Sequence, residues 1–380
     1  MKIENIKIRE VLATNSELTL EVEIHTKKGK VYASVPFGTS KSKYEVNYKD
    51  IEEIKSIFPQ IKKYFLEDFR NITEVDLMLH SLDNSENFKR IGGNLALGIS
   101  LAFLKAFALE EGIPLYRYLT EKPTIPKPVC NVAGGWKGQS DIQEFLLLPV
   151  HQTSFKESIK TISKLYLKVG EMLKKKDKNF KFCKNIESAW VTQLAPEGIL
   201  QILNEVKEEN IGIGLDMAAS NIWNGEFYVY KDKILSSMQQ LEYVSSLIKE
   251  FKIFYVEDPF HQDDFINFSI LTKNTKCLVV GDDLYATNIK RLKIGLDIKT
   301  TNSVIVKPNQ VGTISDTIKF VKEARKHNLK IVLSHRSGET DDVILSHLAV
   351  GLNVDYFKLG ISGERIIKIN EMIRIEESLD

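Results

Sequence analysis

The sequence has little cysteine, and the cysteines are scattered. Cys130, Cys183 and Cys277 are the only three in 380 residues, and each lies in an apolar run far from the other two. An odd number at this spacing is typical of buried free thiols and argues against a disulfide framework or a zinc site. The sequence therefore predicts a reducing compartment, and we expect a cytoplasmic protein.

The chain also lacks an excess of charge of either sign. Its 52 Lys and Arg residues balance 51 Asp and Glu residues, for a formal net charge of +1. The N-terminal segment is charged throughout, unlike a signal peptide, and we expect no later apolar run to reach membrane-spanning length. These absences predict a partner that is neither a nucleic acid nor a membrane.

The length and the hydrophobic pattern predict two units. Residues 3–34 alternate apolar and polar side chains, which favours an antiparallel meander with one wet face. Helical patterns follow over residues 48–68, 72–82 and 91–111. Three prolines within EKPTIPKPVCN then mark a boundary near Lys122. We therefore expect an α+β domain over residues 1–122 and a second domain over residues 123–380.

The second domain has the pattern of an α/β barrel. Apolar runs alternate with helical segments, and from residue 216 the runs recur at roughly 25-residue steps, about one strand and one helix of a (β/α)8 barrel. The runs read VCNVAGG, EFLLLPV, FKFCKNIES, IGIGLDMAA, KIFYVEDPF, KCLVVGDDL, NSVIVKPNQVG, KIVLSHRSGE and DYFKLG. The predicted helices cover residues 155–175, 198–209, 238–251, 314–327 and 341–352.

Polar residues at the ends of these runs are the candidate site. They are Glu144, Asp216, Glu257, Asp282, Lys307, His335 and Lys358. Because barrel strands open on one rim, we expect these side chains to converge there. Carboxylates on successive strands suit Mg²⁺, which prefers oxygen ligands. A lysine beside such a cation would have a lowered pKa and could act as a base.

Simpler structural roles stand beside these functional ones. A single acid at a strand end is more often a helix N-cap or a loop ion pair than a metal ligand. Taken alone, Lys307 and Lys358 fit lysines that extend to the barrel mouth, and His335 fits a buried imidazole. Three acids on successive strand ends outweigh the simpler role for the carboxylates.

The motifs at these strand ends resemble those of the enolase family. VEDPF, VGDDLYATN, VKPNQVGT and SHRSGETDD occur in the family's order, and further matching segments, from GGNLALGISLAFLKAFA to RIIKINEMIRIEESL, extend the resemblance nearly from end to end. The resemblance implies an enolase-type barrel with an N-terminal α+β capping domain. It also implies that the barrel begins with an antiparallel pair of strands.

The resemblance implies a magnesium site and a lysine base. Asp216, Glu257 and Asp282 match the family's Mg²⁺ ligands. Lys307 matches the base that removes the proton next to the substrate carboxylate, and Lys358 matches a residue that helps to neutralise that carboxylate. Cations placed where charge develops stabilise the enolate that would form.

The resemblance also implies a phosphate site and an oligomer. Arg336 and Ser337 match residues that hold the substrate phosphate, although Arg336 equally fits an ion pair with Glu339 or Asp341. Ser40, in GTSKS, matches a loop serine that contacts a second Mg²⁺. By analogy with the family we expect a homodimer or a larger homo-oligomer.

Two departures from the family pattern bear on the reaction. Where the family carries a glutamate that acts as general acid, this chain reads AWVTQLAP and the matched position is Val191. Where a loop histidine closes over the substrate, the chain reads AGGWKGQS, with Lys137 near the place of that histidine. Glu144 is then the preferred substitute acid, and Glu187, four residues before Val191, is a weaker candidate.

These departures give three functional hypotheses. Proton abstraction needs the metal ligands and Lys307, whereas loss of hydroxide without an acid is slower by about 10²–10⁴-fold. The leading expectation is therefore a Mg²⁺-dependent paralogue that enolises a small phosphorylated or polyanionic carboxylate. The alternatives are the glycolytic conversion of 2-phosphoglycerate to phosphoenolpyruvate by a phosphopyruvate hydratase, and a non-catalytic binding protein on the same fold.

Overall fold

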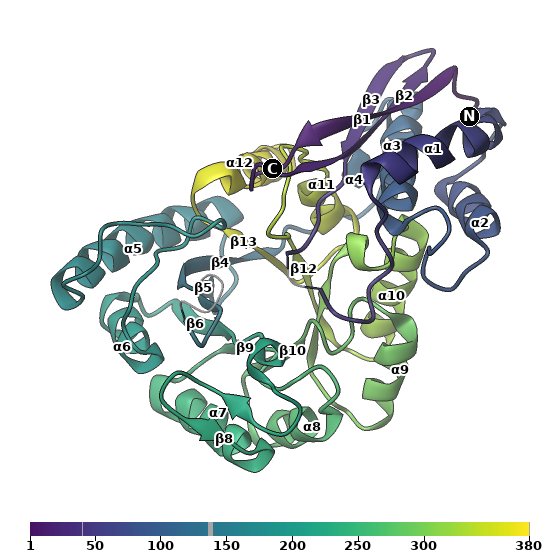
Figure 1. Ribbon diagram of the computed structural model, residues 1–380. Coiled ribbons are helices and arrows are strands. Elements are labelled where there is room, and N and C mark those ends of the chain that lie inside the picture. The colour runs from purple at the N-terminus through teal and green to yellow at the C-terminus, as the bar shows by residue number, and fades with distance from the viewer. Residues whose placement is uncertain (40, 136–139, 380) are drawn as a thin grey trace.

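An N-terminal α+β unit lies beside a closed barrel in this protein (Figure 1). The structure is a computed structural model and describes residues 1–39, 41–135 and 140–379. The expected barrel with a capping domain is confirmed. The predicted boundary near Lys122 falls between the last helix of the first unit and the first barrel strand, and its exact position stays a prediction.

The N-terminal sheet is the predicted antiparallel meander. Its strands β1 (Asn5–Leu12), β2 (Leu18–Thr26) and β3 (Gly29–Ser34) pair in sequence order. Apolar residues of β2 such as Leu20, Val22 and Ile24 are fully or almost fully buried. The alternating pattern of this segment therefore gives one face of the sheet to the core.

Helices follow the sheet in the sequence, and the longest of them packs against β2 and β3. They are α1 (Ile51–Ile61), the 3₁₀ turn η1 (Lys62–Leu66), α2 (Ile72–Asp83), α3 (Gly93–Glu111) and α4 (Leu115–Leu119). The single helix expected over residues 48–68 is wrong, because it divides into α1 and η1. Pro59 lies in the last turn of α1, where it supplies no backbone donor, and the chain then tightens into η1.

Helix α3 is long and apolar enough, by length and composition, to cross a membrane. The expectation that no run reaches that length is therefore wrong for this helix. In the structure, 83% of its most apolar window is buried inside the protein, and α3 packs against β2 and β3. Such burial is that of a core helix of the N-terminal unit.

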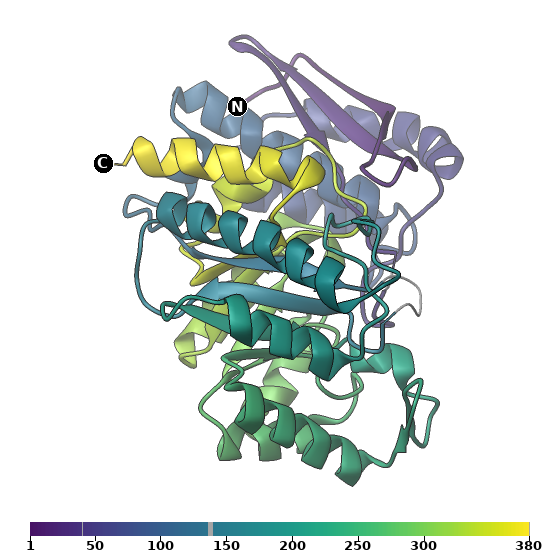
Figure 2. The same cartoon turned by 90° about the vertical axis from the view of Figure 1, so that its left-hand side faces the viewer.

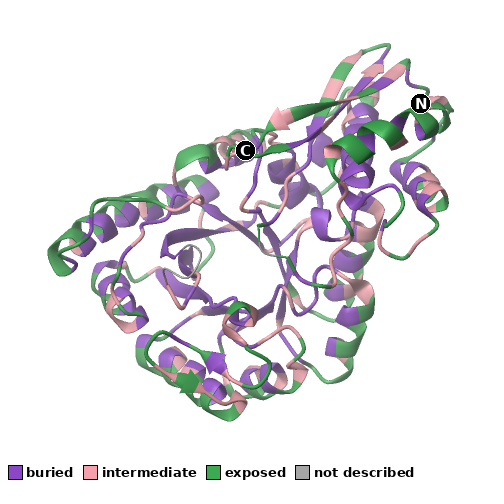
Figure 3. Ribbon diagram, viewed as in Figure 1, coloured by how far each residue is buried: buried purple, intermediate pink, exposed green. Residues whose placement is uncertain are grey.

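Eight strands formed by the described residues close into the barrel. They are β4 (Lys127–Gly134), β5 (Glu144–Pro149), β6 (Ile211–Asp216), β9 (Tyr255–Glu257), β10 (Leu278–Gly281), β11 (Ser303–Val306), β12 (Lys330–Ser334) and β13 (Tyr356–Gly360). The order around the barrel is β10-β11-β12-β13-β4-β5-β6-β9. Figure 3 shows that these strands are buried along their length, as expected for continuous apolar runs.

Strand β5 runs opposite to the other strands of the barrel. It pairs antiparallel with both β4 and β6, whereas β6 and β9 pair in parallel. The carboxyl ends of the other strands therefore lie at the same rim as the first residue of β5. This reversal brings Glu144, which begins β5, opposite Asp216, which ends β6.

Helices surround the barrel (Figure 1). They are α5 (Phe155–Lys176), α6 (Pro196–Val206), α7 (Ser237–Phe251), α8 (Phe265–Asn274), α9 (Ile289–Asp297), α10 (Ile314–Lys326), α11 (Ile344–Gly351) and α12 (Ile366–Glu377). Figure 2 shows α12 beside α5, where Glu376 accepts hydrogen bonds from the backbone nitrogens of Phe155 and Lys156 at 2.6 and 2.9 Å. The C-terminal helix thus caps the first helix of the barrel.

The apolar run FKFCKNIES does not form a strand, although the other eight predicted runs do. Its phenylalanines, Phe180 and Phe182, pack edge-on against Trp190, outside the barrel ladder. Cys183, in the same run, is exposed, so the expectation of a buried thiol is wrong there. Cys130 and Cys277 are buried, and all three cysteines are free thiols.

A histidine ion pair joins the two units. Nε2 of His80, on α2, lies 2.7 Å from a carboxylate oxygen of Asp316 in the first turn of α10. The hydrogen bond to Asp316 raises the pKa of His80 above its ordinary 6.5. The stability that this pair contributes is therefore present below about pH 6.5 and is lost as the pH rises through the raised pKa.

We expect His80→Ala to lower the melting temperature at about pH 6 more than at about pH 9. Because both side chains are about one-third exposed, the difference corresponds to about 0.5 kcal/mol or less. Thermal unfolding at the two pH values measures it. His151→Ala, which removes an exposed histidine from the loop after β5, is the matched control. An equal loss at both pH values would contradict the ion-pair account.

Candidate active site

A cavity of about 450 Å³ opens at the barrel rim. The predicted site residues that line it are Glu144, Asp216, Asp282, Lys307, His335, Arg336, Ser337 and Lys358. Glu257 lies beside them, with Oε2 2.9 Å from Nζ of Lys358. Ser40 and Lys137 lie outside the described residues. The structure thus brings together every predicted site residue that it describes.

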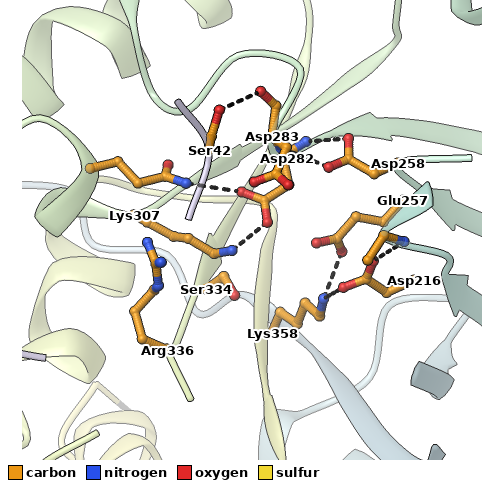
Figure 4. A network of polar contacts seen from close by, with 12 residues as sticks. Ser42, Asp216, Glu257, Asp258, Asp282, Asp283, Lys307, Ser334, Arg336 and Lys358 are labelled. Carbon is orange, nitrogen blue, oxygen red and sulfur yellow. Dashed lines mark hydrogen bonds and ion pairs between the residues drawn. The ribbon is translucent and has the colours of Figure 1, made fainter. Parts of the chain in front are cut away.

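Strand register places three acids in one row. Glu144 is paired with Asp216 across β5 and β6, and Asp216 is paired with Glu257 across β6 and β9. Lys358, two residues before the end of β13, points at this row (Figure 4). Its Nζ lies 2.6 Å from Asp216, 2.9 Å from Glu257 and 3.1 Å from Glu144. These carboxylates outweigh burial and raise the pKa of Lys358 well above its usual range.

Asp282 joins this row from the next strand. It follows β10, and its carboxylate contacts Nζ of Lys307 and accepts a hydrogen bond from Nε2 of Gln310 at 3.2 Å. Burial acts to lower the pKa of Lys307, but Asp282 outweighs it and raises that pKa. The lowered pKa that the sequence predicts applies to Lys307 beside a bound cation, and it stays a prediction.

The acids of the row fit a hard divalent cation. Oε1 of Glu257 is buried and has no hydrogen-bond partner among the described residues. Burial, followed by the charge of Asp216, raises the pKa of Glu257 to about 8. An unpartnered buried oxygen beside further carboxylates is the donor set that Mg²⁺ binds. Asp216, Glu257 and Asp282 are thus suited to hold such an ion.

Two neighbouring acids support this arrangement. Single carboxylate oxygens of Asp258, Asp282 and Asp283 all lie within 4.8 Å of one another. The carboxylate of Asp258 accepts hydrogen bonds from the backbone nitrogens of Asp282 and Asp283, at 2.9 and 2.7 Å. Asp258 therefore fixes the chain after β10, which determines where Asp282 points.

Glu187 occupies the cavity near Glu144. The two carboxyl groups share a hydrogen bond, and Nδ2 of Asn131 donates to Oε2 of Glu187 at 3.2 Å. Burial raises the pKa of Glu144 well above its usual range. Burial acts in the same direction on Glu187, but His335 and the hydrogen bond with Glu144 lower the pKa of Glu187 to about 2. These opposite pKa shifts favour Glu144 as the partner that carries the proton.

The location of Glu187 corrects the assignment to Val191. Val191 does not line the cavity, and its backbone nitrogen donates to the carbonyl of Cys183 at 3.0 Å. The irregular segment after α5 instead places Glu187, four residues before Val191, at the site. Glu187, the glutamate of the segment NIES, lines the cavity in its place. A buried carboxyl group is therefore not missing from this side of the cavity.

His335 is held in one tautomer by an arginine that the sequence did not single out. Nε of Arg365 donates to Nδ1 of His335 at 3.0 Å, so Nδ1 is the acceptor. Burial lowers the pKa of His335 to about 3, and the imidazole is neutral. Its proton is then on Nε2, which lies 3.9 Å from Oε2 of Glu187.

Arg336 lies between the barrel and a loop of the N-terminal unit. Its guanidinium group lies 3.2 Å from Glu45 and donates to Oδ1 of Asn309 at 3.3 Å. A Cβ atom on Gly38 would collide with this guanidinium group, so a larger residue there would displace the Arg336 side chain. The side-chain pair expected with Glu339 is wrong, since Glu339 accepts from the Arg336 backbone nitrogen instead.

Ser337 faces the same loop. Its Oγ accepts a hydrogen bond from the backbone nitrogen of Thr39 at 2.9 Å. Thr39 and Gly38 line the cavity together with Arg336 and Ser337. The predicted phosphate-binding residues are therefore enclosed by both units of the protein, a contact between positions about 300 residues apart that the sequence pattern could not reveal.

Comparison with known proteins agrees with this architecture. Residues 3–119 match the family model "Enolase, N-terminal domain", and residues 122–380 match "Enolase, C-terminal TIM barrel domain". The chain is 38% identical to an enolase of Archaeoglobus fulgidus, over 100% of this chain and 98% of the relative. It is 37% identical to an enolase of Picrophilus torridus, over 100% and 99% of the two chains. Both domain models and full-length relatives match, and the chain therefore belongs to the enolase family.

Proposed function

We propose that this chain is a phosphopyruvate hydratase, which converts 2-phosphoglycerate to phosphoenolpyruvate and water with Mg²⁺ as cofactor. The observation that carries the proposal is the placement of Lys307 and of the carboxyl pair Glu144 and Glu187 in one cavity. Lys307 follows β11 and Glu144 begins β5, and these strands lie opposite each other in the closed strand order. Elimination needs a proton removed on one side and a proton supplied on the other.

The expectation of a paralogue that enolises without dehydrating its substrate is wrong. The matched relatives are 34–38% identical to this chain, the match covers at least 97% of each of them, and they are named enolase. One is the protein of Haloquadratum walsbyi, which is 35% identical over 99% of both chains. The reason for that expectation was a missing general acid. Glu187 beside Glu144 removes the reason, because it places the carboxyl pair in the cavity.

The residues divide the reaction among them. In this proposal Lys307 takes the proton from the carbon next to the substrate carboxylate. The proton shared by Glu144 and Glu187 passes to the departing hydroxyl group, which leaves as water while the carbon–carbon double bond forms. Nε2 of neutral His335 lies 3.9 Å from Oε2 of Glu187 and faces this acid pair.

The remaining residues hold the charged groups of the substrate. Asp216, Glu257 and Asp282 would bind Mg²⁺, which supplies positive charge where the enolate develops. Lys358 adds a positive charge beside the substrate carboxylate. Arg336 and Ser337 would hold the phosphate, a group that suits the planar guanidinium donors of arginine.

Several parts of the proposal rest on the family resemblance alone. They are contacts of Ser40 and Lys137 with the substrate or a second Mg²⁺, assembly into a homodimer or larger homo-oligomer, and a cytoplasmic location. A glycolytic role follows from the proposed substrate. Small phosphorylated carboxylates are the substrate class that the basic and acidic groups of the cavity suit.

A direct assay tests the proposed function. The purified chain is mixed with 2-phosphoglycerate and Mg²⁺, and phosphoenolpyruvate is followed by its ultraviolet absorbance. We expect turnover in the usual enzyme range, about 1–10³ s⁻¹. Chelation of the metal should abolish product formation, and Mg²⁺ added in excess should restore it. No product at saturating Mg²⁺ would contradict the proposal and favour a non-catalytic role.

A further inference from the structure

The barrel interior beneath the acidic row contains a cluster of mostly apolar side chains. Its buried cluster consists of Val129, Leu146, Leu148, Tyr255, Val280, Ile305, Val332 and Tyr356. Tyr255 is fully buried, and its hydroxyl group donates a hydrogen bond to Oε2 of Glu257 at 2.6 Å. The two residues are two apart on β9, so their side chains point to the same face of the strand.

A glycine on the neighbouring strand makes room for this tyrosine. Gly214 of β6 is paired with Tyr255 of β9. A Cβ atom on Gly214 would lie 3.2 Å from both Cβ and Cδ1 of Tyr255, closer than most side-chain contacts allow. The glycine therefore lets the tyrosine ring fill the interior, with its hydroxyl group directed at the acidic row.

The two carboxylate oxygens of Glu257 differ in their hydrogen-bond partners. Oε2 accepts from the Tyr255 hydroxyl group and from Nζ of Lys358, the latter at 2.9 Å. Oε1 has no hydrogen-bond partner among the residues that the structure describes. Figure 4 shows the carboxylate of Glu257 directed toward Lys358, beside Asp216. A carboxylate held at one oxygen keeps the other in a fixed direction.

We propose that Tyr255 is a positioning residue that orients Glu257 for a divalent cation. The inference rests on the proposed function, in which Glu257 is a Mg²⁺ ligand. Partners that hold a metal ligand in place typically change metal affinity by about 10–100-fold when they are removed. The Tyr255 hydroxyl group acts on the cation only through Glu257, and it reaches the site from the apolar side, where water does not compete for the carboxylate.

Titration of Mg²⁺ into the substrate-free full-length protein tests this role. We expect Tyr255→Phe, which removes only the hydroxyl group, to weaken Mg²⁺ binding by about tenfold or more in calorimetry. Tyr356→Phe is the matched control, because Tyr356 belongs to the same cluster but begins β13, and its ring lies 5.9 Å from the ammonium group of Lys127. This control should bind Mg²⁺ as the wild type does. Thermal unfolding without Mg²⁺ verifies that both variants fold.

The outcomes distinguish the inference from the proposed function. Unchanged Mg²⁺ affinity in Tyr255→Phe overturns the positioning role and leaves the proposed function intact. Equal losses in both tyrosine variants also overturn it, since they indicate a general effect of interior packing. A wild-type protein that binds no Mg²⁺ overturns the proposed function together with the inference. If Tyr255→Phe does not fold, Tyr255→Leu is titrated in its place, with the same expected loss.

Discussion

Replacement of Lys307 by alanine lowers phosphoenolpyruvate formation by about 10²–10⁴-fold, the usual contribution of a general base. The ammonium group of Lys307 contacts Asp282 at the cavity wall, and β11 places it opposite the carboxyl pair. Alanine removes the only atom of this side chain that accepts a proton. Exchange of the substrate α-proton with deuterated solvent should be lost to the same extent.

Both rates are measured on one sample, product by absorbance and exchange by nuclear magnetic resonance. Lys330→Ala is the matched control, because Lys330 begins β12 at the other end of the barrel and pairs with Asp355 at 2.7 Å. It should leave both rates unchanged. Retained α-proton exchange in Lys307→Ala would contradict the assignment of Lys307 as the base.

Glu187→Gln should separate the two halves of the reaction. The amide keeps the size of the side chain but no longer completes the carboxyl pair, so dehydration should fall by about 10²–10⁴-fold. Exchange of the α-proton should fall much less, since Lys307 is unchanged. A comparison of the two rates in deuterated buffer measures this difference.

Val191→Ala is the control for this prediction. Val191 lies close to Glu187 in sequence but does not line the cavity, and its recorded hydrogen bond is made by the backbone. Its substitution should leave dehydration and exchange unchanged. Full dehydration activity in Glu187→Gln would contradict the role of the pair. Loss of activity in Val191→Ala would contradict the conclusion that Val191 lies outside the site.

The residues at strand ends could be predicted from the sequence for a physical reason. A continuous apolar run ends at each of Asp216, Glu257 and Asp282. A charged side chain at the end of a buried barrel strand lies at the rim of the barrel. Glu144 precedes its run instead. Its place at the rim depends on the reversal of β5, which the family resemblance implied but the apolar pattern did not.

Other residues of the site could not be found this way. Tyr255 lies inside an apolar run and is indistinguishable by pattern from a core residue. Glu45 reaches the site from the N-terminal unit, and Arg365 reaches it from the turn that follows β13. Glu187 lies in irregular backbone, where neither a period of two nor a period of 3.6 fixes the direction of a side chain. These positions depend on tertiary contacts.

The buried pair of Arg336 and Glu45 has a consequence for the ancestry of the chain. One charge belongs to the barrel and the other to the unit that precedes it, and each side chain is 5% exposed. A barrel encoded without its leading segment would expose Arg336 to cellular anions without the carboxylate of Glu45 to compete with them. A descendant that exchanged one half of the gene for a distant counterpart could lose the partner of one of these two buried charges. We therefore expect selection to keep the two halves together.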